Sequence, residues 1–187
     1  MGISNFSSGF IPPASSGSRK MFIFLMVLTI ASFLGFQGWR VLMNNFSVEI
    51  VGIDGMQMGL IQSIREVPGF LALLVVYLLF VFKEHRLAAL SVLILGLGVG
   101  FTGYLPSFHG LIITTVVMSF GFHYYETLNQ SLTLQHFDRI QAPLVFGRLR
   151  SIGSMTNIGV SLIMLVLAYI MDYRHMFAAI GIAVVVA

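Results

Sequence analysis

The chain of 187 residues contains no cysteine and few charged residues. The absence of cysteine excludes disulfide bonds, thiolate metal sites and cysteine nucleophiles. Only 9% of the residues are Asp, Glu, Lys or Arg, whereas a soluble domain carries about 25%. Hydrophobic residues make up 57% of the chain, and the mean hydropathy is +0.94. This composition predicts a membrane protein whose main partner is the lipid bilayer.

The balance of charge is only slightly basic, with a formal net charge of +3. Nucleic-acid binding normally shows as a basic patch with interleaved aromatic residues, and this sequence has none. We therefore expect no nucleic-acid partner.

The sequence divides into a polar start and a long series of apolar runs. Residues 1–20 are rich in Ser, Gly and Pro, which predicts a disordered cytoplasmic tail. Residues 21–187 predict an all-α membrane protein, a transmembrane helical bundle, because about 20 apolar residues in a helix cross a bilayer core of about 30 Å. The predicted spans are Met21–Asn45, Met56–Phe82, Leu87–Leu105, Leu111–Gln135, Leu144–Met171 and Met176–Ala187.

The sixth predicted span is incomplete. It has about 12 residues and reaches roughly 18 Å, which is too short to cross a bilayer. We therefore expect the chain to be a fragment of a longer protein whose C-terminal half is missing.

Small residues recur at helical spacing in three of the spans. Such spacing favours close contact between membrane helices. In the second span Pro68 also predicts a kink near residues 64–68, because proline removes a helix hydrogen bond. The small-residue positions are Gly55, Gly59 and Ser63; Gly96, Gly98, Gly100 and Gly103; and Gly153, Asn157 and Ser161.

The most informative stretch is 120–135, where an apolar run fills with polar side chains. Each ionisable group at membrane depth costs roughly 2.5–3.5 kcal/mol, so such groups face a protein interior or a watery cavity. The helical spacing i, i+3, i+4, i+7, i+11 predicts one shared face for His123, Glu126, Thr127, Gln130 and Leu134.

Glu126 has two interpretations at this point. It is either a proton relay or substrate contact, or one half of a buried ion pair that fixes helix packing. By its depth in the predicted spans, Arg150 is the expected basic neighbour of Glu126 if the two helix faces meet.

Arg65 and Glu66 lie inside the second span. Adjacent positions do not face each other on a helix, so we expect each to have a partner elsewhere, whether functional or structural. Estimated depths bring Arg40 of the first span near Glu66, which predicts that these two pair.

The first span carries a polar stripe of Gln37, Arg40 and Asn44. One interpretation has Trp39 and Arg40 as anchors at the membrane interface. The other has Arg40 extending into a cavity.

Catalysis is not expected. His123 and Glu126 are able to bind metal, but metal sites in bundles need further ligands from other helices, and the first, third and fifth spans offer none in their cores. No serine lies in a nucleophile elbow. We expect neither a resident cofactor nor enzymatic activity.

Basic residues predict the orientation in the membrane. The loops on one side hold seven of them and the opposite side holds Arg40 and Arg174, so we expect a cytoplasmic N-terminus in an inner or plasma membrane. The seven are Arg19, Lys20, Lys83, Arg86, Arg139, Arg148 and Arg150.

Six spans with short turns and small-residue faces resemble the N-terminal half of a major facilitator superfamily transporter. The local similarities are the Gly55–Ser63 stretch, the basic turn Lys83–Arg86 and the stretch Gly147–Gly153. This resemblance implies two six-helix halves, a central cavity lined by the first and fourth spans, and alternating access by rocking.

We therefore expect a secondary active transporter of a small solute, with a coupling ion such as a proton as a further partner. The alternative is a membrane interaction or regulatory subunit that shares the bundle without transporting. The residues expected along the substrate or proton pathway are Glu126, His123, Gln130, Gln37, Arg40, Arg65 and Glu66.

Overall fold

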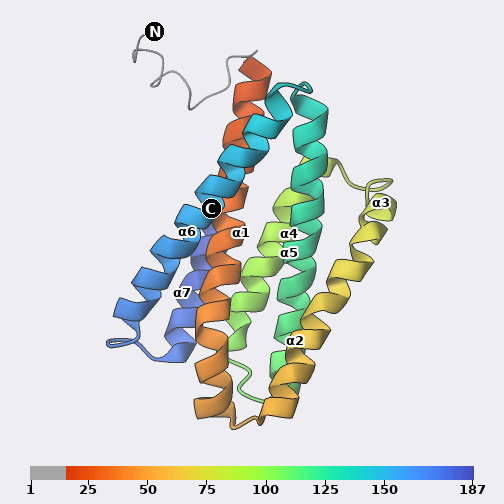
Figure 1. The fold of residues 1–187 in the computed structure, drawn as a ribbon. Helices are drawn as coiled ribbons and strands as arrows, with labels where there is room; N and C mark the ends of the chain where they lie inside the picture. Colours follow the sequence, from red (N-terminus) through yellow and green to blue (C-terminus); the bar gives the residue numbers. More distant parts are fainter. Residues whose placement is uncertain (1–15) are drawn as a thin grey trace.

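A computed structural model describes residues 16–187, and the regular structure in this range is entirely helical (Figure 1). The prediction of an all-α bundle is confirmed to that extent. In chain order the elements are α1 (Ser16–Phe46), the π-helical η3 (Ser47–Val51), α2 (Gly55–Phe70), the 3-10 segment η4 (Leu71–Leu74), α3 (Val75–Leu78), α4 (Glu84–Thr102), α5 (Phe108–His136), α6 (Gln141–Leu167) and α7 (Tyr173–Val186).

Helix α1 begins earlier than predicted. Residues 16–20 belong to the expected disordered tail, but the structure includes them in α1. Arg19 and Lys20 are good helix formers, and both are exposed, so the helix extends beyond its apolar part without burying charge. The remainder of the predicted tail, residues 1–15, lies outside the described residues.

Four helical stretches in the described range are long and apolar enough to cross a membrane. They are Gly17–Val51, Gly55–Leu78, Glu84–Thr102 and Gln141–Leu167. Helix α5 is long enough with its 29 residues, but it is more polar, and α7 has 14 residues. The membrane prediction is therefore confirmed for four helical stretches by length and composition.

The second predicted span is interrupted. Asp54 caps α2, because its Oδ1 accepts from the Gln57 backbone N–H at 2.8 Å and the Gln57 side chain accepts from the Asp54 N–H in return. The α-helix then passes through Pro68 and changes to the 3-10 segment at Leu71. The predicted irregularity thus exists, but it lies beyond Pro68 rather than at residues 64–68.

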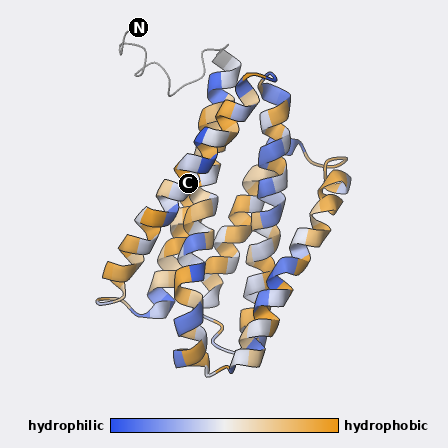
Figure 2. Ribbon diagram, viewed as in Figure 1, coloured by the Kyte–Doolittle hydropathy of each residue, from blue (hydrophilic) through white to orange (hydrophobic). Residues whose placement is uncertain are grey.

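Contacts at the two ends show that the helices alternate in direction. At one end Gln135 of α5 donates to Glu84 at the start of α4, at 2.7 Å. At the other end Tyr173 of α7 donates to Glu49 after α1, at 2.7 Å, and Arg174 lies 4.3 Å from the ring centroid of Tyr104 after α4. Figure 2 shows hydrophilic residues on α1, α5 and α6 at the first of these ends.

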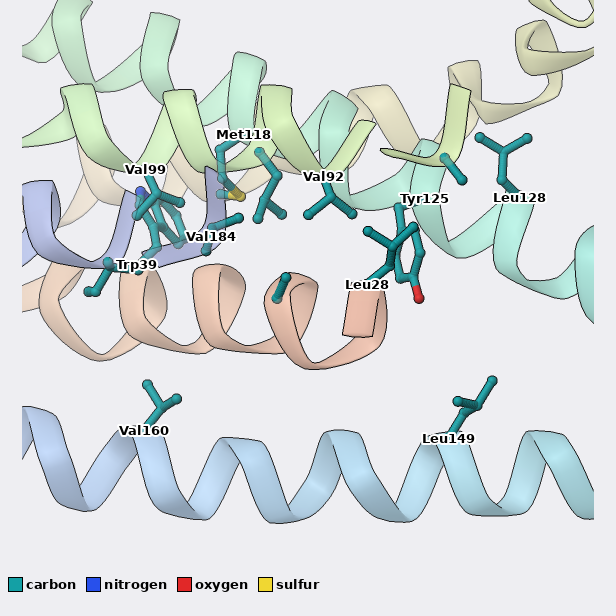
Figure 3. Close-up of a cluster of buried hydrophobic side chains, with 14 of the residues drawn as sticks. Leu28, Trp39, Val92, Val99, Met118, Tyr125, Leu128, Leu149, Val160 and Val184 are labelled. Atoms are coloured by element: carbon teal, nitrogen blue, oxygen red, sulfur yellow. The ribbon is translucent and has the colours of Figure 1, made fainter. Parts of the chain in front are cut away.

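Glycines bring α4 against α5 and α7, as the sequence predicted. A Cβ on Gly98 would lie 2.5 Å from the backbone nitrogen of Met118, and one on Gly181 would lie 2.5 Å from the Cα of Gly100. Real Cβ atoms do not approach so closely, so only glycine permits these helix crossings. Together with α1 these helices enclose the main cluster of buried apolar side chains (Figure 3).

The small residues of α2 behave differently from those of α4. Gly55, Gly59 and Ser63 are exposed, and an added Cβ on either glycine meets nothing within 4 Å. The prediction that this face makes a close helix contact is wrong for the described chain. On α6, by contrast, a Cβ on Gly153 would lie 2.8 Å from the ring of Phe33, so this position does pack closely on α1.

Trp39 does not anchor at an interface. Its side chain is fully buried in the apolar cluster, whereas Arg40 is exposed (Figure 3). The two neighbours point in different directions because successive helix positions are about 100° apart. The interface interpretation is therefore wrong for Trp39.

Candidate functional site

Helix α5 positions three of the seven side chains that were expected along the pathway, His123, Glu126 and Gln130. Ser107 caps its first turn by accepting from the Gly110 N–H at 3.1 Å. These three lie in the second half of α5, and the structure directs them toward two different neighbours. His123 meets α2, whereas Glu126 and Gln130 line a pocket against α1 and α6.

The second of these arrangements is a pocket of about 360 Å³, which we call the Glu126 pocket. Helix α6 packs along α1 but makes few contacts with α5, so space remains between α5 and α6. Figure 3 shows Leu149 pointing from α6 toward α1. The pocket is lined by Thr29, Phe33, Tyr125, Glu126, Asn129, Gln130, Phe146, Gly147, Leu149 and Arg150.

A buried hydrogen-bond network fixes one wall of the Glu126 pocket. The Tyr125 hydroxyl lies 2.8 Å from Thr29 Oγ1 and 3.2 Å from the carbonyl oxygen of Leu25, to which it donates. Tyr125 and Thr29 are both buried. Hydrogen-bonded polar groups in an apolar interior specify one geometry, so α1 and α5 are held in register beside the pocket.

Opposite charges line the Glu126 pocket without forming an ion pair. Glu126 comes from α5 and Arg150 from α6, and no ion pair within 4.0 Å joins them in the described chain. Glu126 lies about ten residues from the end of α5 and Arg150 about nine from the start of α6, or roughly 15 and 14 Å along each helix. Because a short turn connects these antiparallel helices, both groups lie at nearly the same depth, but the expected pairing of Glu126 with Arg150 is not observed in the described chain.

The same pocket contains an amide without a partner. Asn129 Oδ1 is buried and accepts no hydrogen bond from the residues that the structure describes. A buried polar atom left in this way costs free energy unless a ligand or a water satisfies it. The residues that line the pocket therefore include a glutamate, an arginine and an asparagine with a partnerless amide oxygen, together with apolar side chains.

A second polar group, the Arg65 cluster, consists of Arg65, Glu66, His123 and Phe36. The Arg65 guanidinium lies 2.5 Å from Glu66 Oε1 and 5.8 Å from the ring centroid of Phe36. His123 Nε2 is 4.0 Å from Glu66 Oε2, and its ring fills the space beside Gly69. The cluster thus lies where α2 meets α1 and α5.

Two predictions about Glu66 are wrong, namely that it does not pair with Arg65 and that it pairs with Arg40. Glu66 pairs with its neighbour Arg65, because the long arginine side chain reaches round the helix surface to a carboxylate that is 51% exposed. Arg40 is exposed, and no ion pair between Arg40 and Glu66 occurs in residues 16–187. The cavity interpretation of Arg40 therefore has no contact to support it.

Gln37 belongs to a third place in the bundle. Its amide donates to Ser161 Oγ at 2.9 Å and joins α1 to α6. The predicted pathway residues are thus divided among the Glu126 pocket, the Arg65 cluster, this α1–α6 contact and the exposed surface at Arg40. Across the part of the chain that the structure covers, no three His, Asp or Glu side chains gather as metal ligands.

Thr29, Tyr125 and Asn129 were not predicted as site residues. Tyr125 and Asn129 lie off the helical face chosen for α5, because they come one residue before Glu126 and Gln130. The sequence does contain one indication of this site: Thr29 is a polar residue within the apolar run of the first span.

Fold and site together define a class: an all-helical bundle with membrane-length helices and a polar pocket between three of them. No model of a known protein family matches the chain, and no curated protein matches it either.

Proposed function

We propose that the chain is a six-helix unit of a secondary active transporter that moves a small solute by alternating access. The observation that supports this most is the convergence of polar and charged side chains on the Glu126 pocket inside apolar helices. Ionisable groups at membrane depth are costly and normally mark a solute or ion pathway. A packing role alone would favour an ion pair between Glu126 and Arg150, and they do not form one.

The helix arrangement supports a unit of the major facilitator type. Its helices alternate in direction, and polar residues of α1 and α5, the first and fourth long helices of the described chain, line the Glu126 pocket. The N-terminus is cytoplasmic in this proposal, because Arg19, Lys20, Lys83 and Arg86 lie at the same end of the bundle.

A second helical unit is part of the proposal. The exposed side of α2 carries Gly55, Gly59 and Ser63, and Glu66 on the same helix is half exposed. Small residues permit close helix contact, and a half-exposed carboxylate is costly against lipid. A second unit that covers α2 would resolve both features and complete a translocation path. A coupling ion such as a proton is assigned to Glu126.

The test exploits the absence of cysteine in the sequence, since any introduced cysteine is unique in the chain. Gln130→Cys in the Glu126 pocket is exposed to a charged, membrane-impermeant maleimide in right-side-out and in inside-out vesicles of the complete transporter. Alternating access predicts labelling in both orientations. The control, Leu162→Cys on the exposed apolar surface of α6, should be labelled in neither.

Labelling from one side only would contradict alternating access. It would favour the alternative function, a membrane interaction or regulatory subunit with the same helices but no transport.

A further inference from the structure

The Glu126 pocket contains the features of a site for a doubly charged ligand. Its carboxylate and its guanidinium lie on different helices, at nearly the same depth, and neither is neutralised by the other. Glu126 and Arg150 have no other ion-pair partner among residues 16–187. Glu126 is half-buried and Arg150 is exposed. A singly charged ligand pairs with only one of them, whereas a ligand with both charges pairs with both.

The walls between these charges are apolar. Phe33 and Phe146 face the pocket from α1 and α6, and Leu149 extends the same surface. The volume of about 360 Å³ is at the lower end of the usual range for small-molecule sites, roughly 300–1,000 Å³. A ligand that fits is therefore small and has an apolar body.

Hydrogen-bonding groups in the pocket match the two ends of such a ligand. Arginine binds carboxylates with two parallel hydrogen bonds. Asn129 lies about one helical turn beyond Glu126 on α5, and its buried Oδ1 has no partner among the described residues. A small rotation of its side chain would let this oxygen accept from a donor such as an ammonium group. The pocket thus has an acceptor side on α5 and a donor side on α6.

We infer that the Glu126 pocket binds a small zwitterion with an apolar body, of which an apolar amino acid is the simplest form. The ammonium group binds to Glu126 and Asn129, and the carboxylate binds to Arg150. This inference rests on the proposed function, because it names the class of solute for the same pocket.

The experiment measures binding to the full chain in lipid nanodiscs by isothermal titration. Leucine carries both charges, whereas 4-methylpentanoate and 3-methylbutylamine keep its apolar body with one charge each. A second zwitterion, 5-aminopentanoate, separates the charges further. We expect one of the two zwitterions to bind at least about tenfold more tightly than either single-charge compound, because each lost charged hydrogen bond corresponds to about that factor or more.

Two variants then identify which residue binds which charged group of the ligand. Glu126→Gln should remove the advantage of the zwitterion over 4-methylpentanoate and leave binding of 4-methylpentanoate unchanged. Arg150→Gln should remove the advantage of the zwitterion over 3-methylbutylamine and leave binding of 3-methylbutylamine unchanged. A variant that merely misfolds would lose all binding. The control is Arg139→Gln, an exposed arginine in the turn before α6, which should bind as the unmodified chain does.

The inference would be overturned if neither zwitterion bound more tightly than both single-charge compounds. Equal effects of the two variants on all probes would overturn it as well. The two proposals fail separately. Two-sided labelling without zwitterion preference would retain the transporter and reject this solute class, whereas zwitterion binding with one-sided labelling would retain the site and reject transport.

Discussion

The closely packed helices of the bundle and its two loosely packed helices, α2 and α6, are built in opposite ways. On the α4 side, glycines place backbone against backbone, and half of the most apolar 18-residue stretch of α4 is buried. The corresponding stretches of α6 and of Gly55–Leu78 are only 22% and 17% buried. The Glu126 pocket lies against α6 and the Arg65 cluster against α2, and these two loosely packed helices flank the bundle on opposite edges (Figure 1). Close packing therefore forms a scaffold of α1, α4, α5 and α7, and the loosely packed α2 and α6 leave room for polar groups.

The largest expected effect comes from filling the close helix crossing. Gly98→Leu places a side chain against the backbone of Met118, where even a Cβ would lie 2.5 Å from its nitrogen. We expect destabilisation at or above the upper end of about 1–3 kcal/mol for overpacking. Gly59→Leu is the matched control on the loosely packed α2, where an added Cβ meets nothing within 4 Å, and it should stay within about 0.5 kcal/mol. Thermal unfolding of the chain in detergent measures both, and equal losses would remove the contrast between closely and loosely packed helices.

A smaller effect is expected at the wall of the Glu126 pocket. Tyr125→Phe removes the buried hydroxyl that bonds to Thr29 and Leu25, which should cost about 1 kcal/mol. Its neighbour Tyr124 makes only a 3.4 Å hydrogen bond to Leu71 in an exposed position, so Tyr124→Phe should change stability less. Denaturant titration of the two variants ranks them, and the reverse ranking would contradict the role given to Tyr125.

The ion pair of the Arg65 cluster should contribute still less. Glu66 is half exposed, so Glu66→Gln should change the free energy of unfolding by less than about 1 kcal/mol. The difference should shrink further as salt is added, because exposed charges are screened. Unfolding at low and high salt provides the measurement, and a large, salt-independent loss would mean that the pair is buried by a contact absent from the described chain.

The smallest effect is expected at the cap of α7. The backbone N–H of His175 bonds to Asp172 and, with the His175 side chain, lowers the pKa of the Asp172 carboxyl. A lowered pKa in the folded state means that the stabilising contribution is present above the unfolded pKa and is lost as pH falls through the folded value. Asp172→Asn should therefore melt slightly below the unmodified chain at pH 7, and this difference should disappear in strong acid. A difference that grows on acidification would contradict this sign.

Helical periodicity predicted the scaffold better than the site. The glycines of α4 indicated close packing, and the polar residues of α5 indicated a wet face, because both signals follow from spacing along one helix. Spacing does not say which neighbour covers a face. For that reason the glycines of α2 looked equivalent to those of α4 although they are exposed, and Trp39 was placed at an interface although it is buried.

Estimated depth had a similar limit. It made Arg150 the expected neighbour of Glu126, and both residues line the same pocket, although they do not form an ion pair. It failed for Arg40 and Glu66, because depth contains no information on the direction in which a side chain leaves the helix axis. Arg65, next to Glu66 in the sequence, is the nearer partner.

The Glu126 pocket beside the loosely packed α6 should hold water, whereas the closely packed contact of α4 with α7 should not. Single nitroxide labels at Gln130→Cys, in the Glu126 pocket, and at Leu97→Cys, in an apolar groove between α4 and α7, test it directly. Deuterium modulation of the nitroxide echo in heavy water reports nearby water for the chain in lipid nanodiscs. We predict strong modulation at position 130 and almost none at position 97. Equal modulation at the two positions would contradict a wet polar pocket in this bundle.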